Sequence, residues 1–265
     1  MLIDTHCHLD AAEFAADRDA VVARATAAGV SAIVVPAVEA GNFVAVRDCC
    51  VRYAGCVPAY GIHPLHAGNA SEADLAMLRQ WLANESVGPC PPVALGEIGL
   101  DFFVPDFDAA LQEHFFVEQL KIARDLGLPV LLHVRRAVDQ VLKCLRRIQV
   151  CGGIAHAFNG SRQQADEFIR LGFKLGFGGA MTFNGSTRIR RLAATLPLDV
   201  IVLETDAPDM APEFLGRARN ASEYLPRIAA LLAELRGISI DEVVLATSAN
   251  ARALMPGLNG RANHP

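Results

Sequence analysis

Five widely separated stretches of this chain place a histidine or an acidic residue where a short apolar, strand-like run ends. These residues are His6 and His8, Glu97, His133, His156 and Asp206. In a closed barrel of parallel strands, the carboxyl ends of the strands meet at one mouth, so residues far apart in sequence converge there. The pattern therefore predicts a barrel with a set of nitrogen and oxygen ligands at one end.

Apolar runs alternate with segments of helical period along the whole chain. We expect strands over residues 2–6, 32–37, 57–62, 93–98, 129–134, 152–157, 174–178 and 200–205. We expect helices over 17–28, 41–53, 71–85, 109–126, 136–148, 161–171, 186–195, 222–236 and 241–254. This order is typical of an α/β fold of the TIM-type (β/α)8 barrel class. An open doubly wound sheet is the alternative, and the chain lacks the glycine-rich phosphate loop that usually accompanies it.

Length and local signals complete the expected architecture. The chain has 265 residues, 52% of them hydrophobic, which suits one large core and a single domain over residues 1–265. Ser71, Ser161 and Ser222 are expected to cap the starts of helices. Residues 256–265 are expected to fray.

Composition limits the class of protein. A net charge of -5 argues against a sequence-independent DNA coat, which needs a broad basic surface, but it allows an enzyme that binds a few phosphates locally. We find no leader in residues 1–10 and no apolar run long enough to span a bilayer, so we expect no membrane association. The seven cysteines are odd in number and never spaced as Cys-x-x-Cys, which favours packing roles in a reducing cytoplasm. Nothing in the sequence implies an obligate protein partner.

The first pair of candidate ligands lies close together in sequence. His6 and His8 flank Cys7, and because successive strand residues face opposite sides, the two imidazoles share a face and can chelate one ion. Two ordinary polar residues at a strand end are the alternative for this pair alone. Asp4 is expected on the same face, where it would orient a histidine ring.

The remaining candidates extend the set to two ions. Glu97 lies in an apolar run that does not tolerate an unpaired carboxylate, and its two oxygens can bridge two metal ions roughly 4 Å apart. His133 and His156, each explicable alone as a core histidine, form a second nitrogen and oxygen set with Glu97. Asp206 can bind the first ion and also accept a proton from the attacking water.

Two other carboxylates lie near these positions. Asp101 is expected to fix the turn after the Glu97 run, and Glu204 to lie behind the ligands and not among them.

This donor set indicates hydrolysis assisted by metal ions. Histidine and carboxylate ligands suit zinc, magnesium or manganese and exclude a structural zinc site of four cysteines. We therefore expect two divalent cations per subunit, which activate water and stabilise developing charge. The chain has no Gly-x-Ser-x-Gly motif and no cysteine beside a plausible base, so acyl-enzyme chemistry has little support.

Six ordered motifs resemble those of the TatD family of metal-dependent deoxyribonucleases. They are Ile-Asp-Thr-His-Cys-His (3–8), Gly-Ile-His-Pro (61–64), Gly-Glu-Ile-Gly-Leu-Asp (96–101), His-Val-Arg-Arg-Ala (133–137), His-Ala-Phe-Asn-Gly (156–160) and Glu-Thr-Asp-Ala-Pro (204–208).

The resemblance implies an amidohydrolase-like barrel with up to two divalent ions. By motif, the first ion would bind His6, His8, Glu97 and Asp206, and the second would bind His133, His156 and the shared Glu97. It also implies cleavage of phosphodiester bonds in DNA, with 3′ to 5′ exonuclease activity. Some motifs are closer to a lineage described only as metal-dependent hydrolases.

Residues near the ligands are candidates for substrate contact. Arg135 lies two residues after His133 and can bind a phosphate oxygen, with an ordinary salt bridge as the alternative. His63 precedes Pro64 and is expected to hang over the mouth. Phe102, Phe103 and Phe158 could stack on a base, although core or loop packing is the simpler interpretation for each.

We thus expect a cytoplasmic barrel hydrolase that cleaves single-stranded DNA, with Asp206 and Glu97 as catalytic residues. A small-molecule amidohydrolase acting on an amide, ester or lactone with the same ions is the alternative. A metal-holding protein without turnover is a third hypothesis.

Overall fold

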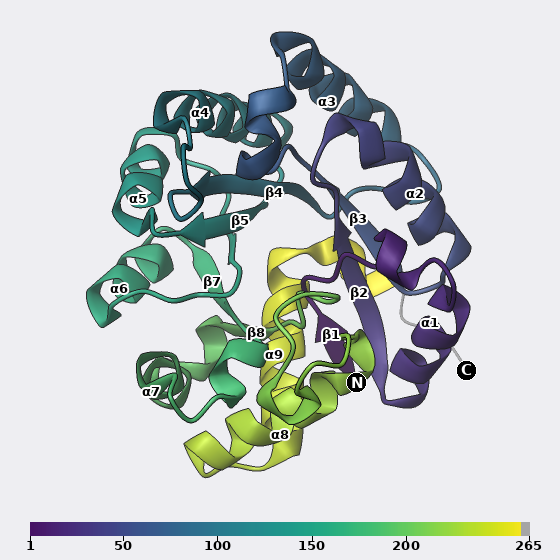
Figure 1. The fold of residues 1–265 in the computed structure, drawn as a ribbon, viewed down its shortest axis with the longest axis vertical. Coiled ribbons are helices and arrows are strands. Elements are labelled where there is room, and N and C mark those ends of the chain that lie inside the picture. Colours follow the sequence, from purple (N-terminus) through teal and green to yellow (C-terminus); the bar gives the residue numbers. More distant parts are fainter. Residues whose placement is uncertain (261–265) are drawn as a thin grey trace.

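Eight parallel strands form one sheet in sequence order from β1 to β8 in the computed structural model, which describes residues 1–260 (Figure 1). The strands are β1 Leu2–Asp4, β2 Val30–Pro36, β3 Cys56–Tyr60, β4 Ala94–Asp101, β5 Val130–Arg135, β6 Gly153–Ala155, β7 Phe173–Phe177 and β8 Ile201–Leu203. Each lies where the sequence predicted a strand, so the (β/α)8 barrel is confirmed.

Helices surround this sheet (Figure 1). They are α1 Arg18–Ala27, α2 Phe43–Arg52, α3 Glu72–Glu85, α4 Ala109–Leu126, α5 Val138–Arg147, α6 Arg162–Arg170, α7 Thr187–Thr195, α8 Leu225–Arg236 and α9 Ile240–Leu254. Short 3-10 helices lie at Ala12–Phe14, Ala40–Asn42, Pro64–Asn69, Gly179–Thr182, Leu198–Val200, Glu213–Leu215, Ser222–Tyr224 and Pro256–Gly260. Within the described chain, none of the helices combines the length and apolar character needed to cross a bilayer.

The seam between β1 and β8 closes through backbone hydrogen bonds just beyond the ends of the two strands. Thr5 N donates to Leu203 O at 3.1 Å, Asp206 N donates to His6 O at 2.8 Å, and His8 N donates to Ala207 O at 2.8 Å. The first and last candidate ligands are therefore tied to each other by the backbone.

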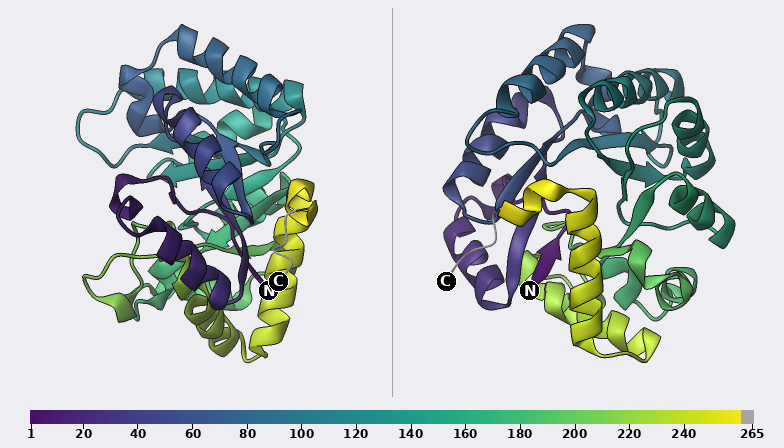
Figure 2. Two further views of the ribbon diagram at one scale, coloured as in Figure 1. Left: turned by 90° about the vertical axis from the view of Figure 1, so that its right-hand side faces the viewer. Right: turned by 180° about the vertical axis from the view of Figure 1, so that it is seen from behind.

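The interior of the barrel is closed at the opposite end by the C-terminal part of the chain. Met255 and Leu258 pack with the inward-facing Ile3, Val34 and Val57 in one buried cluster. Figure 2 shows α9 and the turn after it lying across the back of the barrel. The same cluster contains the small residues Ala32, Ala59 and Ala94, which leave room for Met255 and Leu258. We call these two side chains the plug. The mouth at the other end of the barrel stays open.

The C-terminal tail departs in part from the sequence prediction. Residues 256–260 form a 3-10 helix and do not fray, because Leu258 is buried beneath the barrel. The rest of the tail, residues 261–265, lies outside the described residues.

Helix caps agree with the prediction at two of three positions. Ser71 and Ser161 form capping boxes at the starts of α3 and α6. Ser222 does not cap α8, because its hydroxyl donates to Asp4 Oδ2 at 2.7 Å and the residue belongs to a 3-10 turn.

The sequence predicts packing roles for the seven cysteines. Six are buried and Cys151 is exposed. Their burial fits a packing role.

Replacing Met255 by Ala should lower the free energy of unfolding by about 2–5 kcal/mol, because it leaves a cavity where the plug fills the barrel. The matched control is Leu245→Ala on α9, whose side chain is 74% exposed and should change stability by about 0.5 kcal/mol at most. Urea unfolding followed by circular dichroism measures both. Equal effects of the two changes would contradict the assignment of Met255 to the core.

Candidate metal and active site

The open mouth of the barrel brings together all six residues that the sequence proposed as metal ligands. His6 and His8 follow β1, Glu97 lies within β4, His133 lies in β5, His156 follows β6 and Asp206 follows β8. They come from five different strand ends, and their ring nitrogens and carboxylate oxygens form overlapping groups within 4.8 Å.

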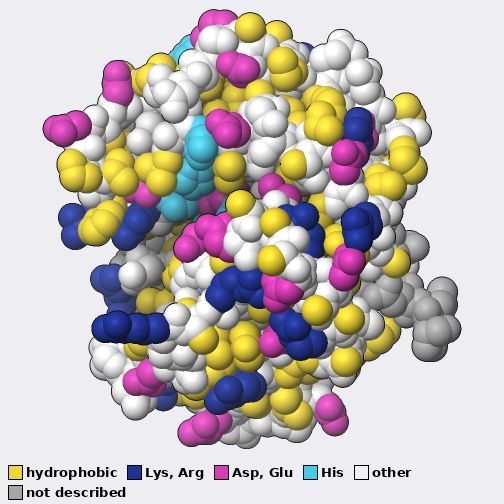
Figure 3. Space-filling model, turned by 45° about the vertical axis from the view of Figure 1, so that its right-hand side comes forward, with side chains coloured by type: hydrophobic (Ala, Val, Ile, Leu, Met, Phe, Trp, Pro, Cys, Tyr) yellow, Lys and Arg dark blue, Asp and Glu magenta, His cyan; other side chains and the backbone are white. Residues whose placement is uncertain are grey.

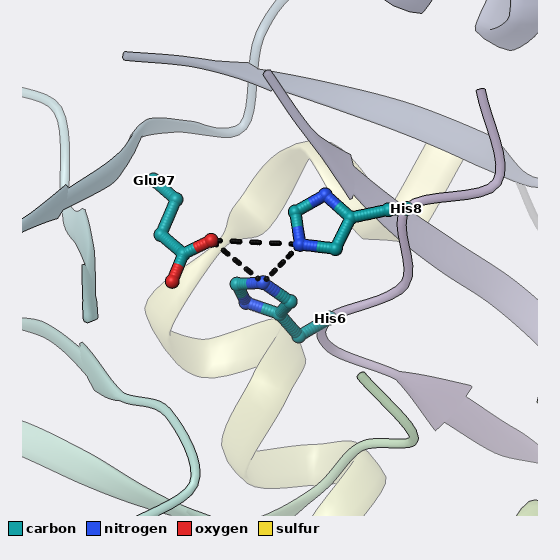
Figure 4. A group of neighbouring side chains, drawn as sticks. All are labelled: His6, His8 and Glu97. Carbon is teal, nitrogen blue, oxygen red and sulfur yellow. Dashed lines mark hydrogen bonds and ion pairs between the residues drawn. The ribbon is translucent and has the colours of Figure 1, made fainter. Parts of the chain in front are cut away.

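One oxygen of Glu97 faces the residues from the β1–β8 seam. Glu97 Oε2 lies 3.2 Å from His6 Nε2 and 3.5 Å from His8 Nε2, and the two ring nitrogens are 3.3 Å apart (Figure 4). Asp206 Oδ1 completes this group at 3.6 Å and 3.7 Å from the same two nitrogens. The four atoms surround a space suited to one cation.

The other oxygen of Glu97 faces a second group. Glu97 Oε1 lies 3.0 Å from His133 Nδ1 and 3.1 Å from His156 Nε2. His63 Nε2 lies 3.6 Å from the same oxygen. His63, which the sequence placed among substrate contacts, thus lies within the second group of possible ligands.

An irregularity in β4 aims Glu97 into the mouth. The register of β4 against β5 shifts between Leu95 and Ile98. Both residues pack in the core between sheet and helices, although strict alternation would place residues three apart on opposite faces. The extra residue therefore turns Glu97 inward, as bulges beside functional sites commonly do.

Gly99 lets the next part of β4 approach β5 closely. A Cβ at this position would lie 1.9 Å from His133 O. The missing side chain therefore allows His133 to sit beside the Glu97 segment.

The charges in the mouth favour a cation. Glu97 is 2% exposed; burial raises its pKa, but His6, His63 and His156 outweigh this and hold the pKa well below its ordinary value. Burial lowers the pKa of His8, yet the hydrogen bond and charge of Glu97, with Asp206, raise it to about 9. The buried carboxylate of Glu97 thus favours the protonated form of His8, and a bound divalent ion would supply the same positive charge.

His63 is neutral at neutral pH. Burial, the largest influence, lowers the pKa of His63 to about 3. A neutral imidazole is the form that binds a metal ion or accepts a proton.

Two further carboxylates support the mouth from behind. Asp101 Oδ2 lies 2.9 Å from His133 Nε2, so Asp101 orients this ring and does not only fix the turn, as its sequence position suggested. Glu204 accepts a hydrogen bond from Ala157 N and lies 3.7 Å from His156 Nδ1.

The expectation that Asp4 orients a histidine ring is wrong. Asp4 accepts hydrogen bonds from the backbone N–H of His6 at 3.3 Å and of Thr205 at 2.9 Å. Its partners therefore fix the seam of the barrel. Burial raises the pKa of Asp4 to about 6.

The candidate substrate residues differ in their surroundings. Arg135 is exposed, has no salt bridge among the described residues, and lies with its Cζ 3.7 Å from the centre of the Phe103 ring. The salt-bridge alternative for Arg135 is therefore not seen. Phe158 is buried in the core, whereas Phe103 is 44% exposed at the rim.

A cleft of about 1310 Å³ opens over these residues and is lined by His8, His63, Glu97, His133 and Asp206. Figure 3 shows histidine side chains in this hollow, with acidic side chains beside them and basic side chains gathered along one edge. The cleft is larger than most pockets for one small molecule, which are about 300–1,000 Å³.

The sequence predicts the six candidate ligands, but it does not predict the full contacts of His63 and Asp101. The second-group position of His63 and the contact of Asp101 with His133 depend on the path of loops after β3 and β4. The only sequence signal for either was its place within a motif, Gly-Ile-His-Pro for His63 and Gly-Glu-Ile-Gly-Leu-Asp for Asp101.

The donor set fits divalent cations on grounds of its own geometry. Each Glu97 oxygen faces two or three imidazole nitrogens, and Asp206 adds an oxygen on one side. Nitrogen and carboxylate donors of this kind are typical ligands of zinc, manganese and related ions.

Comparison with known proteins gives concordant results. The profile of a family described as TatD related DNase matches residues 3–256. The chain is 41% identical over 253 residues to the uncharacterized metal-dependent hydrolase YjjV of Escherichia coli K12, covering 95% of this chain and 96% of that one. It is 34% identical over 260 residues to the 3′-5′ ssDNA/RNA exonuclease TatD of Klebsiella pneumoniae, covering 96% and 97%. The crystal structure of the TatD homologue YjjV from E. coli superposes with a TM-score of 0.92 at 40% identity, covering 96% of this chain and 98% of that chain.

Metal uptake should release protons at neutral pH. The pKa of His8 is raised to about 9, so the metal-free ring is protonated at pH 7 and must lose its proton to bind an ion. Affinity should therefore rise with pH up to about 9 and then level off. Calorimetric titration with Zn²⁺ or Mn²⁺ in two buffers of different ionisation enthalpy measures the proton count.

His114→Gln is the control for this titration, since His114 is exposed on α4 and should leave the proton count unchanged. Identical heats in the two buffers at pH 7 would contradict the predicted release.

Proposed function

This chain belongs to the family of TatD-related DNases and is a metal-dependent hydrolase, and from that premise we propose that it cleaves phosphodiester bonds in single-stranded DNA from the 3′ end with two divalent cations. The observation that carries the proposal is that the two carboxylate oxygens of Glu97 face two separate groups of histidines. A carboxylate that bridges two ions is the arrangement used by two-metal phosphodiesterases and nucleases.

The residues fall into two proposed ligand sets. His6, His8 and Asp206 would hold one ion and His133 with His156 the other, while Glu97 would contribute one oxygen to each. His63 lies close enough to Glu97 Oε1 to join the second set or to contact substrate. When bound, the ions would supply an activated water and stabilise negative charge on the phosphoryl group.

The chain's own residues would carry the proton and the substrate. Asp206 lies at the edge of the first set with its carboxylate partly exposed, so it can accept the proton of the attacking water. As the water oxygen bonds to phosphorus, the P–O bond to the neighbouring sugar breaks and the sugar oxygen leaves. Arg135, exposed and free of a salt bridge among the described residues, would hold a phosphoryl oxygen through paired N–H groups.

Nucleic acid is favoured as substrate by the size and charge of the cleft. Arg135, Arg136 and Arg188 line it together with the exposed ring of Phe103. Basic side chains beside an aromatic ring are typical of single-strand binding sites. The relative from Klebsiella pneumoniae that carries the name of a 3′-5′ ssDNA/RNA exonuclease supports the same substrate class.

We further propose that residues 1–265 act as one catalytic unit, since one sheet supplies every site residue. The odd number of cysteines and the lack of a Cys-x-x-Cys spacing support a location in the cytoplasm.

Replacing Asp206 by Asn should lower the rate of DNA cleavage by about 10²–10⁴-fold, because the proton acceptor is lost. Part of the bound metal should remain, since the other proposed ligands are intact. Steady-state kinetics and metal analysis on the same preparation test both statements.

The control is Glu213→Gln, an exposed carboxylate after β8 that does not line the cleft. Full activity of the Asp206→Asn protein would contradict the proposed role of Asp206 as base.

Substrate class is tested by a parallel screen. With Zn²⁺, Mn²⁺ or Mg²⁺ added, we expect release of nucleotides from an end-labelled single-stranded oligonucleotide and little turnover of model amides, esters or lactones. Chelation should abolish the activity, because the proposed chemistry depends on the ions. Turnover of an amide or lactone without cleavage of DNA would overturn the proposal in favour of a small-molecule amidohydrolase.

A further inference from the structure

The cleft above the candidate ligands has two walls of opposite charge. One wall carries Arg135 at the end of β5, Arg136 just after it and Arg188 at the start of α7. The other carries the carboxylates of Asp10 and Glu13 after β1 and of Asp209 after β8. The proposed ligands His8, Glu97, His133 and Asp206 line the same cleft.

The charged side chains on both walls form no close ion pairs among the described residues. Within residues 1–260, none of these six side chains forms a salt bridge, although Arg188 binds Asn159 Oδ1 and Asp10 accepts a hydrogen bond from Asn42. Elsewhere on the surface, opposite charges commonly pair, as between Arg52 and Asp19 at 2.8 Å. Unpaired charge gathered in a cleft acts on a charged ligand and contributes little to folding.

Two basic side chains close to the acidic wall bind groups other than its carboxylates. Arg219 binds the carboxylate of Asp17 at 2.7 Å, and Arg18 binds the backbone carbonyl of Asp10 at 2.8 Å. The carboxylates of Glu13 and Asp209 are exposed at the cleft, where a ligand can approach them.

We infer that the acidic wall formed by Asp10, Glu13 and Asp209 restricts cleavage to the last linkage of a strand that ends in a free hydroxyl. This inference rests on the proposed function and specifies its substrate. The body of the strand lies along Arg135, Arg136 and Arg188, and the terminal nucleoside lies against the carboxylates. A phosphate beyond that nucleoside, whether terminal or part of a continuing strand, is repelled.

The test compares single-stranded oligonucleotides of one sequence that end in a 3′ hydroxyl or a 3′ phosphate, together with a circular single strand. The wild-type protein should cleave the 3′-hydroxyl substrate at least about tenfold faster than the 3′-phosphate substrate and leave the circle intact. The ratio of the two rates should shrink as salt rises, because added ions screen the repulsion.

Neutralising the two exposed carboxylates of the acidic wall, Glu13 and Asp209, should remove this preference. In the double variant Glu13→Gln, Asp209→Asn, the ratio should fall to within about twofold, because cleavage of the 3′-phosphate substrate rises. The matched control is Glu234→Gln, an exposed carboxylate on α8 that does not line the cleft, and it should keep the wild-type ratio.

The outcomes separate this inference from the proposed function. Equal cleavage of both ends by the wild-type protein, or an unchanged ratio in the double variant, overturns the inference and leaves DNA hydrolysis standing. Cleavage of neither oligonucleotide in the presence of metal overturns the proposed function, and this inference with it.

Discussion

A single buried carboxylate determines how the mouth of this barrel is organised. Glu97 is almost inaccessible to solvent, and an isolated charge in such a place is costly unless positive charge surrounds it. Five histidines approach its two oxygens within 3.6 Å, and their protons or bound cations supply that charge. The site is therefore arranged for cations by the same interaction that lets Glu97 be buried.

The rest of the fold holds the partners of Glu97 in place. Backbone hydrogen bonds across the β1–β8 seam tie His6 and His8 to the segment that carries Asp206. Asp101 fixes the ring of His133, and α9 with the following turn fills the far end of the barrel. The plugged end supports stability, and the open end is left for chemistry, as is usual in barrels of this class.

Periodicity and strand-end positions were sufficient to predict the eight strands, the nine helices and the convergence of six polar residues. They failed where a contact depends on local irregularity. Strict alternation from Leu95 does not give the direction of Glu97, because the register shift in β4 breaks the period. Ser222 stands where the sequence predicts a helix cap, yet its hydroxyl donates a hydrogen bond to the buried Asp4 instead. The placement of His63 beside Glu97 depends on a loop path that no periodic pattern encodes.

The central claim is that Glu97 shares its two oxygens between two cations. Anomalous diffraction at the metal edge, from crystals prepared with Mn²⁺ or Zn²⁺, tests it most directly. We expect two peaks about 4 Å apart, one beside Glu97 Oε2 with His6 and His8 and one beside Oε1 with His133 and His156. A single peak, or metal bound away from Glu97, would contradict it.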